Sequence, residues 1–151
     1  MLKISDGDAV ICINGKDFYE ASIITDVPND FLEGFTQLLR KPYNHGVVIT
    51  ACLDPANLYL VLSRGFCEPN NYYEITDGSG NVLENFKRVY LGDVDYIEMA
   101  KELIEDIESD FDNWSSFYCC KPKDEKLRKN IEDLKDAIDF AEYKRSLEKK
   151  K

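Results

Sequence analysis

Residues 93–113 read DVDYIEMAKELIEDIESDFDN, with nine carboxylates and a single lysine, Lys101. Their net charge of −8 makes up most of the −10 carried by the whole chain. At about 100° per residue, the apolar side chains from Ile97 to Tyr118 gather on one side of a helix and the acids spread over the other. This stretch decides the fold, because it predicts a long helix that buries one side against a core and turns an acidic face outward.

The predicted helix begins at an aspartate and carries the candidate site. Asp93 or Asp95 stands at the N-cap position, where a side-chain oxygen accepts hydrogen bonds from the first amides. Acids three or four residues apart repel one another on a helix, so we expect compensating cations nearby. They come either from a basic partner or from Lys126, Lys129 and Lys135 of this chain. The candidate protein-binding residues are Asp95, Glu98, Glu102, Glu105, Asp106, Glu108 and Asp112.

Upstream of this helix, short β-rich runs alternate with turn residues. Asn14-Gly15 suits a two-residue type I′ turn between the first two runs, and the glycine-rich residues 77–81 suit a longer turn between the last two. The two middle runs are nearly continuous in apolar residues, which predicts strands inside the sheet. The six predicted strands are Asp8–Ile13, Lys16–Thr25, Val47–Leu53, Leu58–Ser63, Asn71–Thr76 and Val82–Leu91.

Two further helices are predicted. A short one follows the second strand, because Asp30 and Glu33 have the spacing of a capping box and Pro42 should end it. The last helix spans roughly Asp124–Leu147 and carries an apolar seam with 4-3-4-3 spacing. The seam lasts only about two heptads, so we expect it to pack on the preceding helix, with a dimer as the alternative. The seam comprises Leu127, Ile131, Leu134, Ile138 and Ala141, of which the first four are the candidate dimer contact.

Together these elements predict an α+β fold. It consists of an antiparallel sheet of about six strands, in the order ββαββββαα, packed with one short and two long helices. A length of 151 residues fits a single domain, 1–151. Within it, residues 1–92 would form the sheet and the short helix, residues 93–148 a helical hairpin, and residues 149–151 a frayed tail.

The amino-acid composition indicates which classes of binding partner suit this chain. A sequence pI near 4.6 disfavours direct nucleic-acid binding, which depends on clustered Lys and Arg. An acidic surface instead suits a basic protein partner, although acids also serve solubility alone. The chain shows no membrane segment and no apolar leader in residues 1–8, which predicts a cytoplasmic protein. Its five cysteines would then be free thiols.

The residues contain no motif for catalysis, a metal or a cofactor. His45 is the only histidine and lies in a predicted turn. Cys119 and Cys120 are adjacent and lack the CxxC spacing of redox sites. A zinc site that combined them with Cys67 and His45 would be irregular. We therefore expect no cofactor and no enzymatic activity.

The leading prediction is a non-enzymatic inhibitor module. It would dock its acidic helix face on a basic partner such as a nuclease or another nucleic-acid-binding protein, as toxin-immunity and anti-defence proteins do. A first alternative is a small enzyme or ligand-binding domain, with a pocket between sheet and helices that uses Arg64, Arg88, His45 and tyrosines. A second alternative is a structural or oligomeric component that uses the seam of the last helix.

Overall fold

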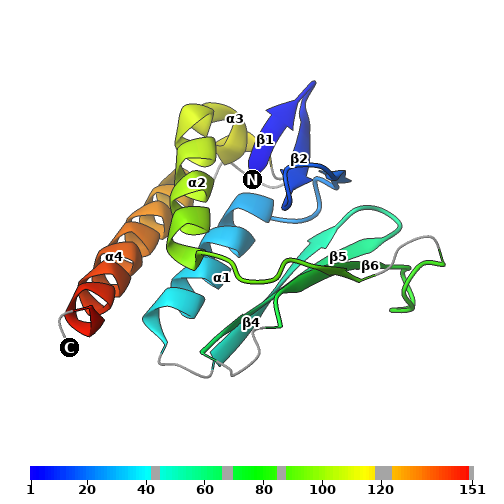
Figure 1. Ribbon diagram of the computed structural model, residues 1–151. Helices are drawn as coiled ribbons and strands as arrows, with labels where there is room; N and C mark the ends of the chain where they lie inside the picture. The colour runs from blue at the N-terminus through cyan, green and yellow to red at the C-terminus, as the bar shows by residue number, and fades with distance from the viewer. Residues whose placement is uncertain (42–44, 66–69, 85–87, 118–123, 150–151) are drawn as a thin grey trace.

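The computed structural model describes residues 1–41, 45–65, 70–84, 88–117 and 124–149. In these ranges, seven strands form two antiparallel sheets, and four helices complete the α+β fold (Figure 1). The predicted fold class is confirmed. The prediction of about six strands in a single sheet is corrected to two separate sheets of three and four strands.

The N-terminal sheet is a three-stranded meander of β1 (Leu2–Ser5), β2 (Asp8–Cys12) and β3 (Phe18–Ala21). Strand β1 was not among the predicted strands. The two-residue turn is Asp6-Gly7, where Ser5 pairs with Asp8 and both turn residues have positive φ. The prediction of such a turn at residues 14–15 is wrong, because Cys12 pairs with Phe18 and leaves a five-residue connection. A type I′ turn needs positive φ at both central residues, and there only the glycine has it.

The second sheet has the order β4-β5-β6-β7. Its strands are β4 (His45–Cys52), β5 (Asn57–Arg64), β6 (Tyr72–Thr76) and β7 (Val89–Tyr90). Both middle runs were predicted inside the sheet, but only β5 lies there, and β4 forms an edge. Apolar side chains on both faces of β4 gave that impression, because Val48 on the open face is as apolar as its buried neighbours Val47 and Ile49. Of the predicted strand 82–91, the described residues 82–84 and 88–91 contain β7 and a bridge from Val82 to Thr76.

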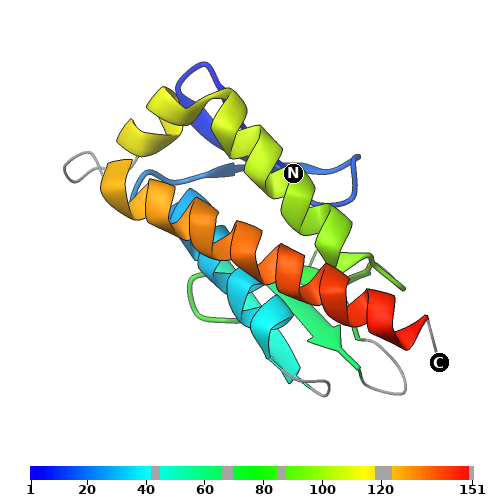
Figure 2. The same cartoon turned by 90° about the vertical axis from the view of Figure 1, so that its left-hand side faces the viewer.

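Helix α1 (Val27–Arg40) lies between the second sheet and the other long helices (Figures 1 and 2). The predicted capping box is wrong, because the helix begins earlier, with Asp26 at the N-cap and a proline in the first turn. Proline suits that position, since the first amides of a helix have no intrahelical acceptor. A Cβ atom at Gly34 would come within 2.5 Å of Ile49 Cγ1. The glycine that weakens this helix in the sequence therefore permits its close approach to β4.

The predicted acidic helix is divided in two. Helix α2 (Tyr96–Ser109) ends at Asp110, whose φ of −139° is not helical, and α3 (Phe111–Ser116) follows it. Helix α4 (Asp124–Glu148) matches the range predicted for the last helix. It packs against α1 as well as α2, and Figure 2 shows α2 and α4 side by side over α1.

One hydrophobic core joins both sheets to α1, α2 and α4. The five seam residues of α4 are all buried in it, so the seam is used within the chain. Dimerisation through the same residues stays a prediction, and it would have to expose part of this core. Within the described ranges, no helix combines the length and the hydropathy needed to cross a bilayer.

Candidate protein-binding surface

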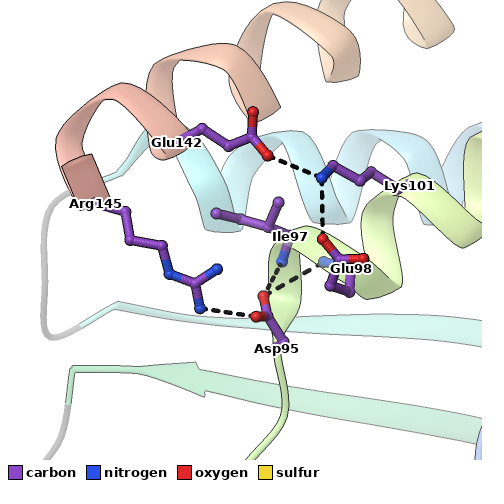
Figure 3. A network of polar contacts seen from close by, with 6 residues as sticks. All are labelled: Asp95, Ile97, Glu98, Lys101, Glu142 and Arg145. Atoms are coloured by element: carbon purple, nitrogen blue, oxygen red, sulfur yellow. Dashed lines mark hydrogen bonds and ion pairs between the residues drawn. The ribbon is translucent and has the colours of Figure 1, made fainter.

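Asp95 starts helix α2 and also ties it to α4. Its side chain accepts hydrogen bonds from the amides of Ile97 and Glu98, at 3.1 and 3.4 Å, which confirms the predicted cap. Its other oxygen lies 2.7 Å from Arg145 Nη2 of α4 (Figure 3). Burial opposes ionisation of this carboxyl, but the Arg145 guanidinium and the two amides outweigh it and hold the pKa of Asp95 below its ordinary value.

The flank of α2 that faces α4 is neutralised by ion pairs. Lys101 Nζ lies 3.0 Å from Glu98 and 2.8 Å from Glu142 of α4 (Figure 3). Hydrogen bonds to Glu142 and then to Glu98 raise the pKa of Lys101. At the far end of α2, Glu108 lies 2.8 Å from Lys135 of α4. The chain itself therefore supplies part of the compensation that the acid-rich sequence demanded.

The predicted compensating lysines are used unequally. Lys135 contacts α2, whereas Lys126 pairs with Asp26 and Glu33 at the start of α1, at 3.4 and 3.2 Å. Among the described residues, Lys129 forms no ion pair. Residues on α4 that the sequence analysis did not single out, Arg145 and Glu142, complete the connection between the two helices.

The opposite flank of α2 contacts β1. The amino group of Met1 forms ion pairs with Glu102, at 2.7 Å, and with Asp106. The amide of Leu2 also donates to Asp106, at 2.8 Å. Burial disfavours the charged amino group, but hydrogen bonds to the two carboxylates outweigh it and raise its pKa. These contacts fix the N-terminal sheet against α2.

The outward face between these two flanks remains open. Glu105 and Asp112 form no ion pair with any described residue. Glu102 keeps 59% of its side chain exposed despite its contact with Met1. Five of the seven predicted binding residues therefore have an intramolecular ion partner, and the acids that point away from the body are mainly Glu98, Glu102 and Glu105.

Beside these acids lies an open groove of about 660 Å³, which we name the acid-rimmed groove. Tyr90 at its mouth is 65% exposed. The groove runs between the loop after β2, the segment that leads from β7 into α2, and α2 itself. Its half-buried apolar lining is formed by Ile13, Val89, Leu91, Val94 and Met99, and its exposed carboxylates are Asp95, Glu98, Glu102 and Glu105.

Sequence reasoning found the acids of this groove but not its apolar lining. The lining residues come from segments that are more than 70 positions apart, from Ile13 to Met99, and no local pattern connects them. The signal that was available is Tyr90-Leu91 directly before Gly92. Successive side chains of a strand point to opposite faces, so Tyr90 and Leu91 cannot both point into the core.

The residues of the predicted enzyme pocket are only partly brought together. His45 and Arg64 are opposite each other on β4 and β5, and Arg64 donates to the Leu39 carbonyl at 3.1 Å. Arg88 lies beside β6 instead, where it pairs with Glu74 at 3.0 Å and stacks on the Tyr72 ring at 4.2 Å. No described hollow is lined by all three residues.

The structure describes two of the five cysteines. Cys12 and Cys52 are free, half-buried thiols. Cys67, Cys119 and Cys120 lie outside the described residues. Among those that are described, no cluster of three or more His, Cys, Asp or Glu side chains is arranged to hold a metal ion.

Comparison with protein families, curated proteins and solved structures finds no match for this chain.

Proposed function

We propose that the protein is a non-enzymatic binding module that docks on a basic protein partner through the acid-rimmed groove. The observation that carries the proposal is the position of Glu98, Glu102 and Glu105 on one face, beside an open groove whose lining is partly apolar. Protein interfaces commonly combine an aromatic or aliphatic centre with a charged, solvated rim. Exposed Tyr90 and half-buried Met99, which line the same groove, supply such a centre.

The ion pairs on the flanks of α2 support this role. Lys101 holds Glu98 from the α4 side, and the amino group of Met1 holds Glu102 from the β1 side. Side chains held in one arrangement lose less rotamer freedom on binding. Asp95 and Glu108 join α2 to α4 and thus contribute to the shape of the site more than to contact with a partner.

Charge defines the partner class. The chain carries −10 overall, and a field of one sign speeds encounter with an oppositely charged protein and disfavours anionic ones. Nucleases and other nucleic-acid-binding proteins have such basic surfaces, because they must bind phosphate. Inhibition of this class, as by toxin-immunity and anti-defence proteins, is the role that we propose. A lysine or arginine of the partner would lie between Glu102 and Glu105 while an apolar side chain enters the groove.

The test is binding to a panel of purified basic nucleases at low and high salt. Glu105→Lys should weaken binding by about tenfold or more, because it reverses the central charge and breaks no ion pair. Asp112→Lys is the matched control, since it makes the same charge change outside the groove, and it should weaken binding by less than about threefold. Both variants should bind less tightly as salt rises.

Three outcomes would contradict the proposal. If no nuclease of the panel binds even at low salt, the proposed partner class is wrong. If Glu105→Lys and Asp112→Lys weaken binding equally, net charge rather than the groove determines affinity. Tyr90→Ala removes an exposed aromatic ring without changing the net charge, and it should weaken binding if Tyr90 is part of an apolar contact. An unchanged affinity in that variant would exclude the apolar centre.

A second candidate function follows from the size of the groove. Its volume of about 660 Å³ lies within the range of pockets that bind small ligands, about 300–1,000 Å³. Such a ligand would be cationic and amphiphilic, to match carboxylates beside an apolar lining. A thermal-shift screen of cationic and neutral compounds distinguishes the two functions, because only a ligand site gives a rise in Tm that Met99→Asp removes.

A further inference from the structure

β4 is an edge strand without the usual protection. It runs for eight residues, His45–Cys52, and pairs only with β5 among the described strands. Exposed edges normally carry lysine, proline or a bulge, or are very short, because their unpaired backbone groups accept other strands. The sequence of β4, HGVVITAC, contains no lysine and no proline. The opposite edge of the sheet, β7, has only two residues.

The hydrogen-bond pattern shows which groups of β4 face outward. The amide of Cys52 donates to Thr25 Oγ1 at 2.9 Å, and its carbonyl accepts from the amide of Ser22 at 2.8 Å. Cys52 thus directs both backbone groups away from β5. Residues of an antiparallel strand alternate in this respect, so Thr50, Val48 and Gly46 also direct theirs outward. Within the described ranges, nothing pairs with these three residues across the edge.

A groove follows this free edge. It has a volume of about 470 Å³ and lies between β4 and the exposed side of α1. Its α1 wall carries Asp30, Glu33 and Gln37. Glu33 also contacts Lys126 and Asn130 of α4, at 3.2 and 3.1 Å, so its carboxylate is held from the α4 side of the groove.

We propose that the β4 edge accepts an extended segment of a basic partner as a fifth strand of the sheet. The outward N–H and C=O groups of Gly46, Val48 and Thr50 would pair with the backbone of the segment. Its side chains would alternate between two environments. One set would be Lys or Arg facing Asp30 and Glu33, and the other would be β-branched side chains beside Val48, which is 61% exposed.

Charge selects this occupant over a second copy of the chain. Pairing two β4 edges would bring together two α1 walls that both carry Asp30 and Glu33, in molecules of net charge −10 each. Like charges across an interface oppose association. A basic segment gains from the same carboxylates. The edge site shares no residue with the acid-rimmed groove, so the two proposals can fail separately.

Amide hydrogen exchange by NMR on the unmodified protein tests the proposal directly. The probe is a synthetic blocked peptide of alternating lysine and valine. The amides of Gly46, Val48 and Thr50 should exchange more slowly when the peptide is present, whereas Val47 and Ile49 are protected already by β5. Unchanged exchange at these three amides under saturating peptide would overturn the proposal, as would protection confined to α2.

Variants at one position separate backbone pairing from side-chain contact. Val48→Pro removes an outward N–H without breaking the ladder to β5, and it should weaken peptide binding by about tenfold or more. Val48→Ala keeps the N–H and should stay within about threefold of the unmodified protein. Equal affinities for the two variants would exclude strand addition. If Val48→Pro does not fold, the exchange experiment remains decisive.

Charge and self-association are tested with the same peptide system. A peptide with glutamate in place of lysine should bind at least about tenfold more weakly, and equal binding would contradict the role of the α1 carboxylates. Asp112→Lys, which lies in neither groove, should change the affinity by less than about threefold. A molar mass by light scattering that doubles with concentration, and that Val48→Pro returns to the monomer, would assign the edge to a second copy and overturn the proposal.

Discussion

At the scale of single residues, Asp95 shows how one carboxylate serves several purposes. It caps α2 through two amides and reaches Arg145 on α4. An N-cap side chain contributes about 1 kcal/mol to helix stability, whereas a partly exposed ion pair contributes about 0.2–1 kcal/mol. The cap is therefore expected to be the larger part of its contribution, and the two parts can be separated by substitution.

Asp95→Ala should lower the free energy of unfolding by about 1–2 kcal/mol, and Asp95→Asn by less than about 1 kcal/mol, because asparagine keeps the cap acceptor. The folded-state pKa of Asp95 is lowered, so the stability due to its charge is present above its ordinary pKa and is lost as the pH falls below about 4. Urea unfolding at several pH values measures this. Asp95→Asn should match the unmodified protein at the lowest pH, and a constant difference would contradict the assigned pKa direction.

At the scale of elements, α4 is positioned by its apolar seam more than by its ion pairs. The seam residues are buried against α1 and α2, while the pairs of Lys101, Lys135 and Arg145 are all partly solvated. A solvated ion pair contributes little to the free energy of unfolding. Removal of a buried leucine costs more, because it leaves a cavity in the core. Ion pairs then set the rotation of α4 relative to α2, and the seam provides most of the energy.

Two leucines of α4 give a matched comparison. Leu134 is fully buried, whereas Leu147 near the end of the helix is 43% exposed. Leu134→Ala should lower the free energy of unfolding by about 2–5 kcal/mol, because it leaves a cavity in the core. Leu147→Ala should lower it by less than about 1 kcal/mol. Chemical denaturation followed by circular dichroism measures both. Similar values would mean that the seam is not part of the core.

At the scale of the whole molecule, the two sheets are joined by more than the chain. The hydroxyl of Tyr73 on β6 donates to Asp17 at 2.7 Å and lies 3.3 Å from the hydroxyl of Tyr19 on β3. Burial, followed by the hydrogen bond to Asp17, raises the pKa of Tyr73. This contact and the shared core connect the small N-terminal sheet to the rest of the structure.

A shared core predicts that the protein unfolds as one unit. Trp114, the only tryptophan, is buried at the end of the helical layer, and its fluorescence reports on that layer. Circular dichroism reports on all helices and strands. The two urea transitions should coincide within error, as in two-state unfolding. A fluorescence midpoint that lies clearly apart from the dichroism midpoint would show that the helical layer separates from the sheets.

The local features of this protein were readable from its sequence. The amphipathic pattern of 97–107, the cap at Asp95 and the range of α4 all depend on residues within a few turns of one another. Strand positions in the second sheet were also found, because β4 and β5 coincide with apolar runs and β6 with a short β-rich run before a glycine-rich turn. Periodicity and capping act over roughly a dozen residues, so sequence reasoning recovers them.

Only the tertiary structure decided how these elements combine. It divided the strands into two sheets, placed β4 at an edge, and turned one flank of α2 toward cations of α4 and the other toward β1. It also formed the acid-rimmed groove from segments between Ile13 and Glu105. Strand pairing, helix rotation and groove formation depend on contacts between residues far apart in the chain. No local pattern specifies which distant surfaces meet, whereas the acidic composition of α2 was evident from the residues alone.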